Sequence, residues 1–177
     1  MVVVELFLES LSPEAHLFIR TTLDKIINDE EMMSSIDLRL YFSGRAKISS
    51  NSTYGIKCPH GVEECSSNIL EACLVREFGI IQALEMIEYL NSKHSITLST
   101  LQKKYPLLEA QKSMLKRCIS KNGKKILEDA LRNTPPIRYV PSMRVDYGPV
   151  LHESDELIPA ICKRISCNKP KICSFVC

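Results

Sequence analysis

The chain has 177 residues, of which 45% are hydrophobic and 25% charged, so it is long and apolar enough to form a globular domain with its own core. Its net charge of +2 implies no polyanionic partner, and the absence of tryptophan with only 6% aromatic residues disfavours a base-stacking surface for nucleic acid. The apolar runs are too short to cross a bilayer, so no transmembrane segment is expected in these residues.

Two strands joined by a helix are predicted in the first part of the chain. Residues 2–8, VVVELFL, form a β-rich apolar run of the kind that a buried strand needs. Ser12 is a good N-cap and Pro13 suits the first helical position, and apolar residues recur at helical spacing from there to about residue 28. Residues 36–42, IDLRLYF, alternate between apolar and polar side chains and predict a second strand. This order predicts a right-handed βαβ crossover.

A block of helices is predicted in the middle of the chain. A long helical pattern runs from about residue 67 to residue 91, and Gly79 marks a break within it. Two or three further helices span about residues 98–132, and the two prolines at 135 and 136 end this region.

The last part of the chain predicts two short strands and a helix. Residues 138–141 and 143–147 are interpreted as the strands, followed by a turn at Gly148-Pro149. Residues 154–165 predict a closing helix, with Pro159 in its first turns, where a proline is tolerated.

The order of these elements is that of a thioredoxin-like α/β fold with a mixed sheet. We expect a single domain over residues 1–177, with a helical insertion at about residues 55–135 between the βαβ and ββα halves. The loop at Ser12 would then lie at the carboxyl end of the first strand, where such folds build their sites.

Eight cysteines are the unusual feature of the composition. They comprise a middle group of three, a lone Cys118 and a C-terminal group of four, namely Cys58, Cys65, Cys73, Cys118, Cys162, Cys167, Cys173 and Cys177. The spacing C-x2-C, which is usual in zinc sites, does not occur, so disulfides are favoured over zinc and over free buried thiols. We expect at least one bond among the middle three cysteines and a bond from Cys162 within the C-terminal group.

A secreted protein is the expectation that follows from these disulfides, because they persist in oxidising compartments. Asn51-Ser52-Thr53 is an N-glycosylation sequon in a polar stretch and agrees with this. The residues Met1 to Val4 lack a basic region and a cleavage site, so we expect a mature form whose signal peptide has been removed.

The middle cysteine group carries a specific motif, C-P-H-G-V-E-E-C-S-S-N-I-L-E-A-C. It resembles the signature C-Q-H-G-x2-E-C-x2-N-x4-C of the gamma-interferon-inducible lysosomal thiol reductase family. The matching residues are Cys58, His60, Gly61, Glu64, Cys65, Asn68 and Cys73, and only Pro59 departs, where the family has Gln. The segment ESLSPEAHLFI is similar to the family's active-site segment, Tyr139-Val140-Pro141 resembles its tyrosine-valine-proline segment, and Cys162 and Cys173 fall near its C-terminal pair.

The family resemblance implies a C-x-x-C pair at the start of the first helix, and here Ser12 and Ala15 stand at those positions. Disulfide exchange needs one thiolate that attacks a disulfide and a second thiol that resolves the mixed disulfide. Serine and alanine supply neither, so we expect a catalytically inactive homologue. The resemblance also implies that Pro141 follows a cis peptide bond.

A secreted protein-binding module is therefore the expected function, with an extracellular or cell-surface protein as its partner. The former substrate groove would hold an extended peptide through backbone bonds, with Ser12, Pro13, Glu14, Ala15, His16 and Pro141 as the candidate binding residues. A serine nucleophile at Ser12 with His16 one helical turn later is the competing interpretation of this segment. We favour Ser12 as an N-cap and His16 as a surface residue.

Two further alternatives remain open. Residual thiol oxidoreductase activity could use another cysteine, such as Cys118 if it is unpaired and exposed. A metal site could combine His60 with Cys58, Cys65 and Cys73, but the resemblance favours His60 as a structural residue of a stapled loop, and no metal or cofactor is expected. The lysosomal or endosomal lumen is the alternative compartment.

Overall fold

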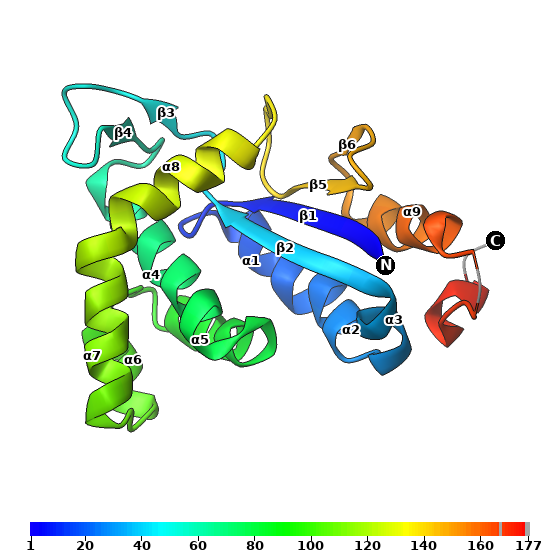
Figure 1. Ribbon diagram of the computed structural model, residues 1–177, viewed down its shortest axis with the longest axis horizontal. Helices are drawn as coiled ribbons and strands as arrows, with labels where there is room; N and C mark the ends of the chain where they lie inside the picture. Colours follow the sequence, from blue (N-terminus) through cyan, green and yellow to red (C-terminus); the bar gives the residue numbers. More distant parts are fainter. Residues whose placement is uncertain (167, 176–177) are drawn as a thin grey trace.

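A four-stranded mixed sheet forms the centre of the protein (Figure 1), whose computed structural model describes residues 1–166 and 168–175. The strands are β1 (Val2–Leu8), β2 (Ile36–Phe42), β5 (Ser142–Val145) and β6 (Val150–Leu151), in the order β2-β1-β5-β6. Strand β1 pairs in parallel with β2 and antiparallel with β5, which pairs antiparallel with β6. This mixed sheet with its helices confirms the thioredoxin-like α/β layout.

The central strand β1 is buried along almost its whole length, as its apolar run predicts. Val4 and Leu6 are fully buried, and Leu8 is almost so. Its one acidic residue, Glu5, is also buried, and its carboxylate accepts a hydrogen bond of 2.6 Å from Nε of Arg144 on β5. The neighbouring strand therefore neutralises the charge that β1 carries into the core.

Helical structure connects β1 to β2, as predicted. Helix α1 (Pro13–Phe18), a π-helical turn (Ile19–Leu23) and α2 (Asp24–Ile27) follow one another without interruption. Helix α3 (Glu30–Ser35) was not predicted. It begins at Asp29, whose carboxylate accepts a hydrogen bond of 2.8 Å from the backbone N–H of Met32, so Asp29 is an N-cap that was not recognised from the sequence.

A small hairpin and two long helices come next. The hairpin consists of β3 (Lys47–Ile48) and β4 (Ile56–Lys57), and it leads into α4 (Val62–Phe78) and α5 (Ile80–Ser92). The predicted break between these helices is confirmed at Gly79, whose φ of 77° lies in the left-handed region.

The helical block continues with α6 (Leu98–Lys104), α7 (Glu109–Arg117), a π-helical turn (Cys118–Asn122) and α8 (Gly123–Asn133). Helix α8 packs against α4, and a Cβ at Gly123 would lie only 3.0 Å from Cγ2 of Ile69. The missing side chain therefore lets the two helices approach closely. In Figure 1, α4 to α7 gather at one end of the sheet and α9 lies at the other.

The C-terminal part differs from the prediction at its first strand. Residues 138–141 are not a strand, since pairing with β1 begins at Ser142, which lies opposite Phe7. A proline at 141 has no N–H to give to a ladder, which explains why the strand begins after it. The partner of β5 is instead β6, and the closing helix comprises a 3-10 turn (Ser154–Glu156) and α9 (Leu157–Arg164), followed by a 3-10 turn (Lys171–Phe175).

Candidate functional site

The N-terminus of α1 is organised by Ser12, which confirms its predicted role as the N-cap. Its Oγ accepts a hydrogen bond of 3.2 Å from the backbone N–H of Ala15 and donates one of 3.1 Å to Oε2 of Glu14. Backbone hydrogen bonding at the helix start, followed by this bond from Ser12, lowers the pKa of Glu14. Ser12 and Ala15 are both buried, at 4% and 1% exposure, so the Ser12 hydroxyl forms its hydrogen bonds within the start of the helix and is shielded from solvent.

His16 makes its hydrogen bond to Ser10 and not to the Ser12 side chain. Its Nε2 lies 2.6 Å from the carbonyl oxygen of Ser10, and a ring nitrogen bonded to a carbonyl must carry a hydrogen. Nε2 is therefore a donor that bonds to the Ser10 carbonyl rather than to the Ser12 hydroxyl, so this geometry gives the interpretation of Ser12 as a serine nucleophile no support. His16 is also half-buried rather than a simple surface residue, and this burial lowers the pKa of its imidazole.

A groove of about 490 Å³ lies beside the start of α1. One wall comes from α1 and its flanks, with Leu11, Pro13, His16 and Ile19, and the other from the end of α5 and the loop after it, with Asn91, Ser92 and Ile96. Of the predicted binding residues, this groove takes in Pro13 and His16. Its second wall lies some 80 residues further along the chain in the helical block, and nothing local in the sequence connects it to α1.

Pro141 follows a cis peptide bond with Val140, as the resemblance implies. The proline is buried, and the next residue, Ser142, pairs with Phe7 of β1. The Oγ of Ser142 donates a hydrogen bond of 2.7 Å to the carbonyl oxygen of Tyr139. Pro141 therefore lies directly before the strand that is the antiparallel neighbour of β1.

Among the residues that the structure describes, three disulfides connect six cysteines, pairing Cys58 with Cys65, Cys73 with Cys118, and Cys162 with Cys173. The first and third confirm the expected bonds within the middle and C-terminal groups. The second shows that the interpretation of Cys118 as a free thiol is wrong. Cys167 and Cys177, which we also expected in disulfides, lie outside the described residues.

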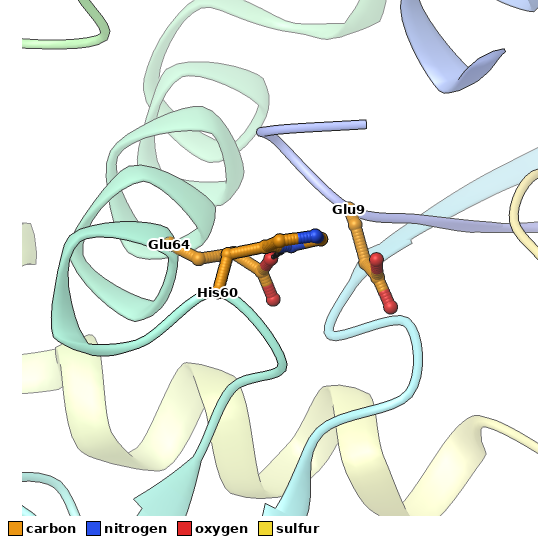
Figure 2. A group of neighbouring side chains, drawn as sticks. All are labelled: Glu9, His60 and Glu64. Atoms are coloured by element: carbon orange, nitrogen blue, oxygen red, sulfur yellow. Dashed lines mark hydrogen bonds and ion pairs between the residues drawn. The ribbon is translucent and has the colours of Figure 1, made fainter. Parts of the chain in front are cut away.

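These disulfides exclude the metal site that combines His60 with the three middle cysteines, because oxidised sulfurs are not thiolate ligands. The structure brings a different set together. Glu9, His60 and Glu64 each offer a ligand atom, and these atoms all lie within 4.8 Å of one another (Figure 2). Nδ1 of His60 hydrogen bonds to Oε2 of Glu64, and burial raises the pKa of that carboxyl. Glu9 was not predicted, since it lies outside the signature.

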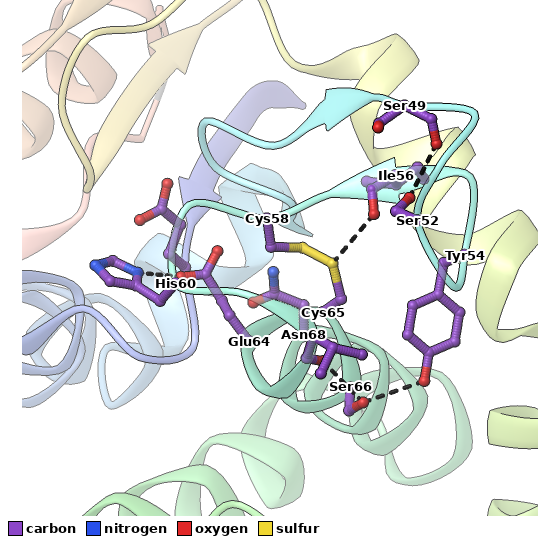
Figure 3. The surroundings of a disulfide bond; sticks show 12 residues. Ser49, Ser52, Tyr54, Ile56, Cys58, His60, Glu64, Cys65, Ser66 and Asn68 are labelled. Atoms are coloured by element: carbon purple, nitrogen blue, oxygen red, sulfur yellow. Dashed lines mark hydrogen bonds and ion pairs between the residues drawn. A yellow bond between two sulfur atoms is a disulfide. The ribbon is translucent and has the colours of Figure 1, made fainter.

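The remaining signature residues tie their loop to the segment that precedes α1. Asn68 is fully buried, and its Oδ1 accepts a hydrogen bond of 2.9 Å from the backbone N–H of Ser10. Gly61 has a φ of 87° directly before α4, and the Cys58–Cys65 disulfide joins the loop to the first turn of that helix (Figure 3). These contacts connect the signature loop to Ser10, two residues before Ser12.

Comparison with known proteins matches residues 3–122 to the family model described as "Gamma interferon inducible lysosomal thiol reductase (GILT)". The chain belongs to this family. In the described part of the chain, no helix combines the length and apolarity that a membrane crossing requires.

Three curated relatives are similar to this GILT-family chain. It is 27% identical to the gamma-interferon-responsive lysosomal thiol protein of Arabidopsis thaliana over 97% of this chain and 75% of that protein. It is 31% identical to GILT-like protein 2 of Drosophila melanogaster over 48% of this chain, and 27% identical to the gamma-interferon-inducible lysosomal thiol reductase of Mus musculus over 70% of it. The chain spans 40% and 52% of the lengths of these last two relatives.

Two solved structures from Mycobacterium tuberculosis are also similar. The reduced form of the disulfide bond oxidoreductase DsbG matches 99% of this chain and 83% of its own with 14% identity and a TM-score of 0.47. Reduced DsbA matches 99% of this chain and 87% of its own with 14% identity and a TM-score of 0.46.

Proposed function

We propose that this GILT-family chain is a catalytically inactive, secreted thiol-reductase homologue that binds another protein. The observation that carries the proposal is the pair Ser12 and Ala15 at the first turn of the helix that follows β1. These are the two positions at which the family resemblance leads us to expect the C-x-x-C cysteines.

The chemistry of disulfide exchange supports this loss of activity. A thiolate must attack a disulfide sulfur, and a neighbouring thiol must then release the product. The Ser12 hydroxyl titrates far above a thiol and is already held by Ala15 and Glu14, while Ala15 ends in a buried methyl group. A helix N-terminus lowers the pKa of a thiol placed there, but neither Ser12 nor Ala15 carries a thiol.

The groove beside α1 is the proposed binding surface. Its side chains are a mixture of apolar and polar groups, with Leu11, Pro13 and Ile96 among them, and this suits an extended polypeptide. Pro141 is buried before β5 and does not line this groove, so its inclusion in the proposed binding surface rests on the family resemblance alone.

Secretion is part of the proposal, with the lysosomal or endosomal lumen as the alternative. The three disulfides support an oxidising compartment, and the sequon residue Asn51 is exposed and accessible to a glycan. We also propose that residues 1–177 form one domain, because a single buried apolar cluster includes Leu6 of the sheet, Leu74 of the helical block and Ile161 of the closing helix.

Restoring both cysteines tests the loss of activity. The variant Ser12→Cys/Ala15→Cys is expected to reduce a model disulfide substrate such as insulin, because the helix start would stabilise the thiolate introduced at position 12. The natural chain is expected to stay at the rate of a free-thiol blank, as measured by insulin turbidity at pH 5 and pH 7.

The matched control is Ser12→Cys alone, which can attack a disulfide but cannot resolve the product, so it is expected to accumulate a mixed disulfide without turnover. Catalytic turnover by the natural chain contradicts the proposal. Failure of the double variant, with its fold intact by circular dichroism, would show that the groove has also lost its fit to reductase substrates.

A further inference from the structure

Three parts of the chain meet at one point beside the candidate site. Glu9 follows β1, His60 lies in the disulfide-closed loop and Glu64 lies in the first turn of α4. Figure 2 shows their side chains converging between the start of α4 and the end of β1. Their ligand atoms lie within 4.8 Å of one another, which is close enough for one ion to bridge all three after small side-chain movements.

One carboxylate oxygen of Glu64 lacks a hydrogen-bond partner among the described residues. The residue is fully buried, and while its Oε2 bonds to Nδ1 of His60, its Oε1 has no hydrogen-bond partner. A buried carboxylate oxygen without a partner loses the stabilisation that water gave it, and this loss is larger for a charged group than for a neutral one. Its side chain extends towards His60 and Glu9, so the unpartnered oxygen belongs to the same cluster (Figure 2).

Glu9 is held in place by Arg45. Its Oε1 accepts hydrogen bonds from the backbone N–H and Nε of Arg45 at 2.7 and 2.9 Å, and its Oε2 accepts one from the guanidinium at 2.8 Å. The adjacent Gly44 makes room for this, since a Cβ there would lie 2.0 Å from Cγ of Glu9. The carboxylate is therefore oriented in advance, and Oε2 retains a lone pair.

The charges of the cluster also favour a cation. Two buried carboxylates face the Arg45 guanidinium and the His60 imidazole, so the cluster carries an excess of negative charge in a largely water-excluded place when both carboxylates are ionised and His60 is neutral. The His60 side chain is 49% exposed, so the cluster has an entry path from solvent.

We propose that Glu9, His60 and Glu64 bind a divalent transition-metal ion of the Zn²⁺ type. One imidazole nitrogen and two carboxylate oxygens suit zinc, whereas Mg²⁺ and Ca²⁺ prefer oxygen ligands alone. The ion replaces the hydrogen bond between His60 and Glu64 and supplies the partner that Oε1 of Glu64 lacks. It would join the end of β1 to the disulfide-closed loop, three residues before Ser12.

Calorimetric titration of the natural chain with ZnCl2 alone tests this proposal. The disulfides are kept oxidised, and iodoacetamide caps accessible thiols beforehand so that no sulfur contributes. We expect saturable binding of one Zn²⁺ per chain, a higher unfolding temperature in the presence of zinc, and no comparable heat with Mg²⁺.

The variants His60→Asn and Glu64→Gln are each expected to weaken zinc binding at least about tenfold and to abolish the rise in unfolding temperature. His94→Asn is the matched control, since it removes another exposed histidine outside the cluster and should leave zinc binding unchanged. Glu64→Gln keeps the shape of the side chain, and His60 is exposed, so both variants should fold; circular dichroism checks this.

The absence of saturable zinc binding by the natural chain overturns the proposal. Zinc binding that survives in folded His60→Asn and Glu64→Gln also overturns it, since the ion would then sit elsewhere. Equal binding of Mg²⁺ overturns the assignment to a transition metal. None of these measurements depends on reductase activity, so the result is independent of the proposed function.

Discussion

At the scale of single residues, Glu71 is expected to contribute to the pH dependence of folding. It lies in α4 at 1% exposure, and its Oε1 has no hydrogen-bond partner. Burial raises the pKa of this carboxyl well above its usual value of 4.5. The unfolded chain therefore releases this proton at a lower pH than the folded chain. The stability it contributes is complete below pH 4.5 and is lost as the pH rises towards the folded-state pKa.

Replacement of Glu71 by glutamine is expected to remove this loss. In the natural chain, the free energy of unfolding falls by about 1.4 kcal/mol for each pH unit between the unfolded-state pKa and the folded-state pKa of this carboxyl. The reason is that over this range the folded chain binds one more proton than the unfolded chain. Glu71→Gln should therefore be more stable than the natural chain at pH 7, with a smaller difference at pH 4. Urea denaturation at both pH values measures this, and Glu63→Gln, exposed on the same helix, is the control. Parallel pH profiles for Glu71→Gln and the natural chain would contradict the assignment.

At the scale of elements, the disulfides hold the helical block together, and their loop lengths rank their effects. Cys73–Cys118 closes a separation of 45 residues between α4 and the turn after α7, whereas Cys58–Cys65 closes only 7. A longer loop removes more entropy from the unfolded chain.

The double variant Cys73→Ala/Cys118→Ala is expected to lose about 4 kcal/mol of unfolding free energy, against about 2.4 kcal/mol for Cys58→Ala/Cys65→Ala, by the chain-entropy relation. Guanidinium denaturation without reductant measures the unfolding free energy of both variants. The two losses can be compared directly, because each variant replaces two buried cysteines by alanine. A larger loss for the short loop would show that the Cys58–Cys65 bond acts through native contacts, such as those of the His60 loop.

At the scale of the whole molecule, the groove depends on the contact between the thioredoxin-like half and the helical block. Ser92 is exposed at the end of α5 and lines the wall opposite Pro13 and His16. A bulky side chain there would fill the groove without entering the core.

Ser92→Trp is accordingly expected to weaken binding of an extended polypeptide at least about tenfold, because the indole would occupy the space that the peptide needs. The probe is fluorescein-labelled, carboxymethylated insulin B chain, with anisotropy as the measurement. Ser99→Trp, exposed on α6 outside the groove, should bind like the natural chain. Equal affinities of the two variants for the insulin B chain would show that the groove is not the binding surface.

Local physical chemistry allowed much of this architecture to be read from the sequence. The apolar run at Val2–Leu8, the alternation at Ile36–Phe42, the cap at Ser12 and the break at Gly79 all agree with the structure. Each depends on neighbours within a few residues, through side-chain period, capping or backbone freedom. The strand expected at residues 138–141 failed for a local reason as well, because a proline at its end cannot donate to a ladder.

The sequence by itself therefore determined the strand–helix–strand start, the helical block that follows it, the family signature and the absence of thiols at positions 12 and 15. Only the tertiary structure decided that Cys73 bonds to Cys118, that α5 forms the second wall of the groove, and that Glu9 meets His60 and Glu64. These contacts join parts of the chain that are 45 or more positions apart, and their partners are chosen by how helices and strands pack rather than by any local periodicity.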